Sequence, residues 1–158
     1  FETASQADVP AETALRCIRI LSENAGMNGM IGGQVLDMLA EHRRISETEL
    51  RLLQKLKTGC LLRAACELGC AAAGKTDTES IEAARAYGDK LGLAFQIEDD
   101  ILDEGTEDNK TTFLTFMTVE SARNTVDGLT GNAKEIIAPY DRDGILSAFA
   151  DRLAVRKV

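Results

Sequence analysis

Apolar residues recur at helical spacing along most of the chain, and no segment shows the sustained alternation of apolar and polar residues that is typical of a strand. The pattern therefore predicts an all-α fold. Two capping boxes, Ser46 with Glu49 and Thr76 with Glu79, mark the starts of two helices. The expected helices cover residues 10–26, 46–68, 76–104 or 105, 112–116 leading into 119–140, and 144–156.

Residues 27–41 leave two interpretations open. Three glycines, Gly29, Gly32 and Gly33, suit a loop, but they would also let a helix press tightly against its neighbours. So many apolar residues would be unusual in an exposed loop. The apolar residues concerned are Met30, Ile31, Val35, Met38 and Leu39. We therefore expect a buried helix here.

The most informative stretch lies near the end of the longest expected helix. Gln96, Asp99, Asp100 and Asp103 follow the spacing i, i+3, i+4 and i+7, which places them on one face of a helix. The other positions of residues 91–104 are mostly apolar, so we expect this acidic stripe to be buried. Ionised carboxylates packed together are strongly destabilising unless a cation lies beside them. A hard divalent cation that also holds phosphate oxygens fits this chemistry. The alternative is that the three aspartates form only a solvated helix face or helix end.

Two lysines are candidate partners of this stripe. Lys57 and Thr58 precede Gly59 within an expected helix, where glycine costs about 1 kcal/mol relative to alanine. That cost indicates a close approach by a neighbouring backbone or a ligand. A second cation, Lys110, precedes two threonines just beyond the stripe. Taken alone, Lys57 is also consistent with a surface lysine, and Lys110 with an ordinary helix cap. Together with the stripe, they predict one site for a metal-bridged diphosphate.

Composition narrows the function classes. The chain has 158 residues, the size of one domain, and a formal net charge of −8. No basic run is present, so we expect no nucleic-acid binding. An anionic ligand would have to be held by local lysine, arginine or metal against this overall charge. We find no signal peptide and no apolar run of about 18 residues, so nothing suggests export or a membrane span.

The cysteine pattern favours a cytoplasmic protein. The four of them, Cys17, Cys60, Cys66 and Cys70, do not have the spacing of a disulfide framework. Cys66 and Cys70 share a helix face, but the chain has a single histidine, His42, and no second cysteine pair to complete a zinc site. Reduced cysteines in a cytoplasmic protein are the simpler interpretation.

Four segments, in this order along the chain, resemble motifs of the trans-isoprenyl diphosphate synthases, or polyprenyl synthetases. Residues 29–37, Gly-Met-Ile-Gly-Gly-Gln-Val-Leu-Asp, are similar to the GMxGGQxLD segment, and residues 56–59, Leu-Lys-Thr-Gly, to the HKTG element. Residues 92–103 resemble the second aspartate-rich motif, and residues 110–113, Lys-Thr-Thr-Phe, the KxTY element. The set is most similar to the C-terminal half of bacterial farnesyl diphosphate synthases.

The resemblance implies an antiparallel bundle of helices around a central cavity, where two aspartate-rich motifs hold three Mg²⁺ ions on an allylic diphosphate. The implied reaction joins dimethylallyl or geranyl diphosphate to isopentenyl diphosphate and gives farnesyl diphosphate. The resemblance also implies a homodimer. The implied site residues are Asp99, Asp100 and Asp103 for metal, Lys57, Thr58 and Gln96 for catalysis, and Lys57, Thr58, Gln96 and Lys110 for substrate binding. Asp99 and Asp103 would be the more direct metal ligands.

The chain also departs from the family pattern. Residues 1–158 contain no first aspartate-rich motif and no basic segment for isopentenyl diphosphate, so we expect them to be the C-terminal part of one domain and inactive alone. Leu56 replaces the histidine of HKTG, and the segment between Asp103 and Lys110 is shorter than usual, by deletion or by missing residues. A non-catalytic regulatory subunit is the main alternative. A class I terpene cyclase is less favoured.

Overall fold

The computed structural model describes residues 1–41, 43–105 and 110–155, and these residues form helices and connecting segments without a strand. The all-α prediction is confirmed. The main helices are α2 (Ala11–Ala25), α3 (Met30–Ala40), α4 (Glu47–Gln54), α5 (Cys60–Ala72), α6 (Thr78–Leu102), α7 (Val119–Ile137) and α8 (Ile145–Ala154). The shorter elements are α1 (Glu2–Gln6), the π-helical turn η1 (Lys55–Gly59), and the 3₁₀ turns η2 (Phe113–Thr115) and η3 (Ala138–Tyr140).

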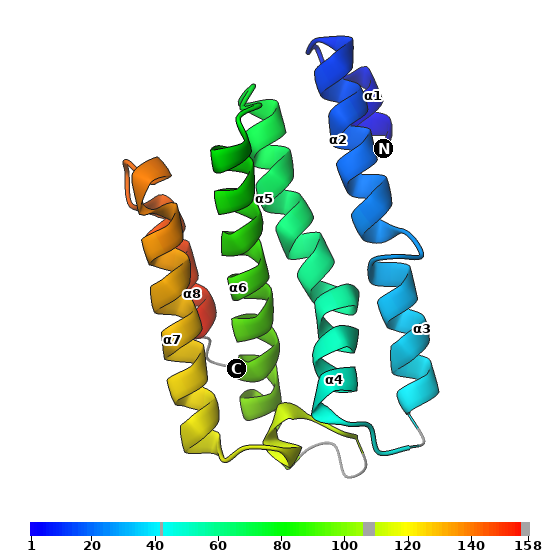
Figure 1. The fold of residues 1–158 in the computed structure, drawn as a ribbon, viewed down its shortest axis with the longest axis vertical. Coiled ribbons are helices and arrows are strands. Elements are labelled where there is room, and N and C mark those ends of the chain that lie inside the picture. The colour runs from blue at the N-terminus through cyan, green and yellow to red at the C-terminus, as the bar shows by residue number, and fades with distance from the viewer. Residues whose placement is uncertain (42, 106–109, 156–158) are drawn as a thin grey trace.

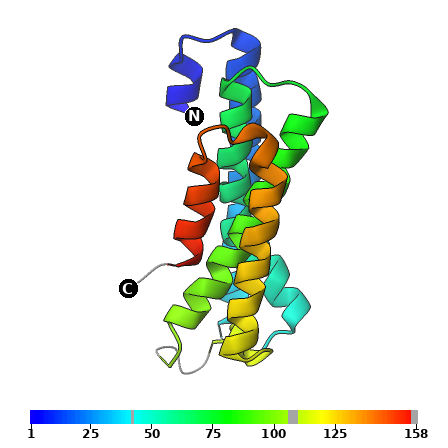
Figure 2. The ribbon, with the colours of Figure 1, turned by 90° about the vertical axis from the view of Figure 1, so that its left-hand side faces the viewer.

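The helices form one antiparallel layer (Figure 1). Helix α3 continues the direction of α2, and α4, η1 and α5 follow one another as a second rod. Helices α6 and α7 complete the layer, and α8 packs on one side of it against both (Figure 2). Helix α6 therefore lies between α5 and α7, at the centre of the molecule.

Two clusters of buried apolar side chains pack α6 against its neighbours. Leu50 of α4, Ile97 of α6 and Phe113 of η2 belong to one buried core, and Phe113 has no exposed surface. Tyr87 and Leu91 belong to a second core, which α8 covers. Burial of large apolar side chains is the main stabilising contribution to such a fold. Helix α6 contributes to both cores, so the rest of the molecule fixes the orientation of its polar stripe.

The predicted bounds of two helices need correction. The cap of α6 is Asp77 and not Thr76, because the Asp77 carboxylate accepts a hydrogen bond of 2.8 Å from the Ser80 N–H. Hydrogen bonds from the Ser80 side chain, and then from the Ser80 N–H, lower the pKa of Asp77. Helix α6 ends at Leu102 rather than at residue 104 or 105, since Asp103 leaves the helical conformation. The helix expected over 46–68 continues to Ala72 and is interrupted by η1.

The glycine-rich segment is a helix, but it is not buried as expected. Gly33 is buried against the backbone of Lys57, so the predicted close packing is confirmed at that position. The apolar side chains are exposed instead, at 46% for Ile31, 64% for Met38 and 65% for Leu39. Their pattern favoured burial, yet no described residue covers this face of α3.

No helix in the described part of the chain is long and apolar enough to cross a bilayer. Three sequence-based expectations fall outside the described residues. They concern His42, residues 106–109 of the shortened segment after the acidic stripe, and Arg156 at the end of the last helix.

Candidate functional site

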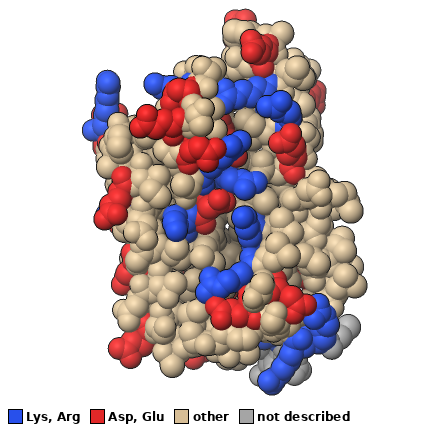
Figure 3. Space-filling model, in the orientation of Figure 1, with Lys and Arg blue, Asp and Glu red and all other residues tan. Residues whose placement is uncertain are grey.

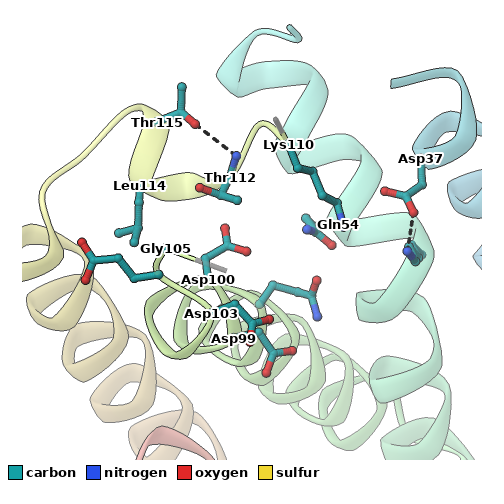
Figure 4. A pocket seen from close by; sticks show the side chains of 13 residues that line it. Asp37, Gln54, Asp99, Asp100, Asp103, Gly105, Lys110, Thr112, Leu114 and Thr115 are labelled. Atoms are coloured by element: carbon teal, nitrogen blue, oxygen red, sulfur yellow. Dashed lines mark hydrogen bonds and ion pairs between the residues drawn. The ribbon is translucent and has the colours of Figure 1, made fainter. Parts of the chain in front are cut away.

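A cleft of about 320 Å³ opens where the end of α6, the η1 turn and residues 110–115 meet (Figure 4). Its lining includes six of the seven site residues expected from the sequence, which are Lys57, Gln96, Asp99, Asp100, Asp103 and Lys110. Thr58 is the exception, because it follows Lys57 in η1 but does not line the cleft. Segments far apart in the sequence thus bring the expected acidic and basic groups together.

The acidic stripe runs from the interior of α6 to its exposed end. Gln96 is 9% exposed, Asp99 and Asp100 are partly buried, and Asp103 is exposed at the helix C-cap. The expectation that the whole stripe is buried is therefore wrong at its last turn, where the helix ends and water reaches the side chain. Asp99 and Asp103 lie side by side on the cleft side of α6 (Figure 4).

Asp100 holds the opposite wall of the cleft in place. Its Oδ2 atom accepts a hydrogen bond of 2.6 Å from the backbone N–H of Phe113, whose side chain is fully buried. Hydrogen bonds to a charged acceptor are stronger than those between neutral groups. This bond ties η2, and with it Thr112, to the last turns of α6. One Asp100 oxygen is thereby committed to the fold.

Lys57 is paired with a carboxylate that the sequence analysis gave no role. Its Nζ atom donates a hydrogen bond of 2.5 Å to Oδ2 of Asp37 on α3, and the two side chains are 32% and 18% exposed. Asp37 lies at the end of the glycine-rich segment, 20 residues before Lys57, and helical spacing does not reveal a contact over that distance. The pair places an ammonium group at the rim of the cleft.

Two glycines allow the η1 turn to sit between α3 and α6. A Cβ atom on Gly33 would lie 2.2 Å from the backbone nitrogen of Lys57, and one on Gly92 would lie 2.9 Å from Cα of Gly59. Both distances are too short for a real side chain, so the three elements meet backbone to backbone. Helix α6 does approach the backbone at Gly59, but the missing side chain that allows this is that of Gly92. A Cβ atom on Gly59 itself would meet only the Gln54 carbonyl oxygen at 3.7 Å and Lys55 Cγ at 3.9 Å, which are ordinary contacts. π-Helical turns are uncommon and occur frequently at functional sites.

Several lining residues were not predicted from the sequence. They are Asp37, Gln54, Glu104, Gly105, Thr112, Leu114 and Thr115. Gln54 lies one helical turn before Lys57, so helical spacing could have predicted that both line the same site. Thr115 is oriented by the backbone, because its hydroxyl accepts a hydrogen bond of 3.1 Å from the Thr112 N–H. Figure 4 shows both threonines on the wall opposite α6.

The donor set of the cleft fits a hard cation that is shared with a ligand. Five carboxylates line it against the ammonium groups of Lys57 and Lys110. Within the described residues, however, no three His, Cys, Asp or Glu side chains converge closely enough to enclose a metal ion by themselves. Mg²⁺ typically binds through one or two carboxylates together with water and substrate phosphates, so the arrangement fits that ion with a phosphate ligand.

Comparisons with known proteins show which family the chain is similar to in sequence and in fold. The sequence model of the polyprenyl synthetase family matches residues 2–125. A farnesyl diphosphate synthase of Haemophilus influenzae is 33% identical over 164 residues, covering 95% of this chain and 56% of the relative. The apo structure of an FPP/GFPP synthase from Zymomonas mobilis has a TM-score of 0.87 at 30% identity, covering 96% of this chain and 55% of that one. A geranyltransferase of Helicobacter pylori, complexed with magnesium and isoprenyl diphosphate, has a TM-score of 0.79 at 29% identity, covering 96% and 54%.

The chain spans about half the length of the curated relatives it matches. The matched residues 2–125 include all four segments that resemble family motifs, from Gly29 to Phe113. The helical arrangement of solved family structures extends over nearly the whole chain. The chain therefore belongs to the polyprenyl synthetase family.

Proposed function

We propose that the protein carrying these residues is a prenyltransferase, which joins dimethylallyl or geranyl diphosphate to isopentenyl diphosphate and gives farnesyl diphosphate. Residues 1–158 are then the C-terminal part of a single polyprenyl synthetase domain. The observation that carries the proposal is the cleft lined by Lys57, Lys110 and the acidic stripe in a member of this family. A diphosphate needs both cations and metal-binding carboxylates at one place, and this cleft has both.

In the proposed reaction, Lys57 and Lys110 bind the allylic diphosphate through charged hydrogen bonds. The carbon–oxygen bond of this substrate breaks, and its electron pair goes to the leaving pyrophosphate. Both ammonium groups stabilise the negative charge that develops there, and preorganised charges of this kind supply a large part of enzymatic rate enhancement. Asp37 holds the Lys57 ammonium in position, so the lysine does not need to be ordered by the substrate.

Gln96 and the backbone carbonyls of η1 near Thr58 have a different proposed role, which is to face the allylic cation. Gln96 is 9% exposed and lines the cleft, so its amide oxygen is a fixed partial negative charge. Thr58 lies in η1, where the altered hydrogen bonding of a π turn changes the direction of the backbone carbonyls. The double bond of isopentenyl diphosphate then attacks the cation, a carbon–carbon bond forms, and a proton passes to the released pyrophosphate.

Asp99 and Asp103 are the proposed ligands of Mg²⁺, with Asp100 contributing beside them, and the complete site is proposed to hold three such ions. When bound, Mg²⁺ supplies positive charge that neutralises the diphosphate oxygens. The carboxylates of the stripe contribute hard oxygen donors on two successive turns of α6. The magnesium and isoprenyl diphosphate bound in the related Helicobacter pylori geranyltransferase support this assignment.

The proposal extends to partners and location. We propose a homodimer that acts in the cytoplasm on these two diphosphates, without nucleic acid and without a membrane span. The net charge of −8 disfavours nucleic acid as a partner. The dimer rests on the family alone.

The test is a turnover assay of the complete protein with dimethylallyl diphosphate, isopentenyl diphosphate and Mg²⁺. We expect prenyl diphosphate products of 10 and 15 carbons, and we expect Asp99→Ala to lower turnover by about 10³-fold or more. Asp127→Ala is the matched control, because Asp127 lies exposed on α7 and does not line the cleft. Both variants should keep the far-ultraviolet circular dichroism of the parent protein.

The products also separate the alternatives. A regulatory subunit would give no product alone but would change the activity of a partner enzyme. A terpene cyclase would convert a prenyl diphosphate to a hydrocarbon or alcohol without consuming isopentenyl diphosphate. Full activity of the Asp99→Ala variant would contradict the proposed metal site whatever the product.

A further inference from the structure

A second cavity lies between the end of α4, η1 and helix α6, with Leu129 of α7 at its edge. Its volume is about 380 Å³, which is in the range of small-molecule sites. The buried glycines Gly59 and Gly92 form its floor, and Ala86, Leu93 and Leu129 supply apolar walls. We call this cavity the η1–α6 groove. None of the carboxylates of the acidic stripe lines it.

The rim of the groove is basic although the chain as a whole is acidic. Arg51, Lys55 and Lys90 line it against one carboxylate, Asp89, in a chain of net charge −8. Figure 3 shows a small hollow near the middle of the face that it presents, with basic and acidic side chains beside it. A local excess of positive charge beside a low-dielectric wall attracts anions against the global field.

The three cations of the rim differ in how they are paired within the described residues. Arg51 pairs with Glu47 at 2.7 Å and lies 5.5 Å over the ring of Phe113. Lys55 and Lys90, in contrast, make no ion pair with any residue that the structure describes. Lys55 of η1 and Lys90 of α6 lie at the rim, above the floor formed by the two glycines. The site therefore has a polar end and an apolar end.

We propose that the η1–α6 groove binds a small amphiphile with an anionic head group and an apolar chain. Lys55 and Lys90 hold the head group through charged hydrogen bonds, and the walls formed by Ala86, Leu93 and Leu129 remove the chain from water. Residues of η1, among them Gly59, line the groove. Gln54 lines both the groove and the cleft. The proposal stands independently of the prenyltransferase reaction.

The test is isothermal titration of the protein with octyl phosphate, inorganic phosphate, 1-octanol and octanoate. We expect octyl phosphate to bind at least about tenfold more tightly than inorganic phosphate or 1-octanol, because each of these offers one half of the ligand. Octanoate distinguishes a phosphate head group from any anion. The double variant Lys55→Gln, Lys90→Gln should weaken octyl phosphate binding by about tenfold or more. Ala86→Phe should weaken it as well, because the larger side chain fills the groove.

Two control variants locate the binding. Lys134→Gln removes a lysine from α7 that does not line the groove, and it should leave octyl phosphate binding unchanged. Lys57→Gln removes one cation of the cleft, where the proposed function itself allows a phosphate with an apolar chain to bind. The Lys55→Gln, Lys90→Gln double variant is therefore also made in the Lys57→Gln background, where the remaining binding should still depend on Lys55 and Lys90. Loss of all binding in Lys57→Gln would move the ligand to the cleft and overturn the proposal. Unchanged binding in the double variant or in folded Ala86→Phe would overturn it too, and so would equal affinity for inorganic phosphate.

Discussion

At the scale of single residues, the contact between Lys57 and Asp37 is the one most open to test. The pair joins η1 to α3, and its side chains are 32% and 18% exposed. We expect Asp37→Asn to lower the free energy of unfolding by about 1 kcal/mol, because it leaves a partly buried ammonium without its counter-charge. Urea unfolding followed by circular dichroism at 222 nm measures this change.

The chain contains a matched control for that prediction. Lys134 and Asp151 form an ion pair at 2.8 Å on the surface, with side chains 38% and 55% exposed. Exposed pairs contribute little, so Asp151→Asn should change the free energy of unfolding by less than about 0.5 kcal/mol. Equal losses in the two variants would mean that burial does not strengthen the Lys57 pair.

Glu49 is the residue through which acid pH should act on α4. Hydrogen bonds from the Ser46 N–H, and then the Arg43 guanidinium, lower the pKa of Glu49 to about 2. The folded state therefore binds fewer protons than the unfolded state, and the stabilisation is present above pH 4.5 and lost as the pH falls towards 2. We expect the urea midpoint of Glu49→Gln to fall less than that of the parent protein between about pH 6 and pH 3.

Glu120→Gln is the control for this pH series. Glu120 lies in the first turn of α7, and its side chain makes no hydrogen bond or ion pair with any residue in the described ranges. Its variant should follow the parent protein across the whole series. The same pH dependence in parent and Glu49→Gln would show that the capping box is not the source of the acid sensitivity.

At the scale of elements, the junction of α3 with η1 depends on a missing side chain. A Cβ atom on Gly33 would lie 2.2 Å from the backbone nitrogen of Lys57, which cannot move like the end of a flexible side chain. We expect Gly33→Ala to lower the free energy of unfolding by about 1 to 3 kcal/mol. Gly128→Ala on α7 is the control, because nothing lies within 4 Å of a Cβ there, and it should raise stability by about 0.5 to 1 kcal/mol. Unfolding curves that move in the same direction for both variants would contradict the close packing.

The elements also show how far the sequence could predict the structure. Helical spacing located α2, α6 and α7, because each buries one face and the spacing of apolar residues reports that face. The π turn at Lys55–Gly59 was not predicted, because its residues fit an α-helical pattern equally well. What selects the turn is contact with Gly33 and Gly92, which come from other helices. The cap at Asp77 was missed for a local reason, since two adjacent residues both suit an N-cap.

At the scale of the whole molecule, the candidate site was predictable where its residues share one helix. The acidic stripe of α6 follows from spacing alone, whereas the pairing of Asp37 with Lys57 depends on how α3 packs on η1. Burial was harder to predict than position. Asp103 is exposed because α6 ends there, and α3 is exposed because no described residue covers its outer face.

That outer face leads to a prediction for the behaviour of the chain in solution. Ile31, Val35, Met38 and Leu39 lie on one face of α3 and are 46%, 44%, 64% and 65% exposed. Apolar side chains gathered in this way form a contiguous patch, and such patches favour association because contact removes them from water. We expect the 158-residue chain to self-associate with increasing concentration in sedimentation velocity experiments.

Charged substitutions test whether the association depends on this face of α3 or on non-specific apolar contacts elsewhere on the surface. The double variant Ile31→Lys, Met38→Lys should shift the chain towards the monomer, since each lysine would have to be desolvated in the contact. Leu52→Lys is the control, because Leu52 is 50% exposed but lies on α4, outside this row of residues. It should leave the association unchanged. A parent chain that stays monomeric over the same range, or equal shifts in both variants, would show that the α3 face does not drive contact between copies.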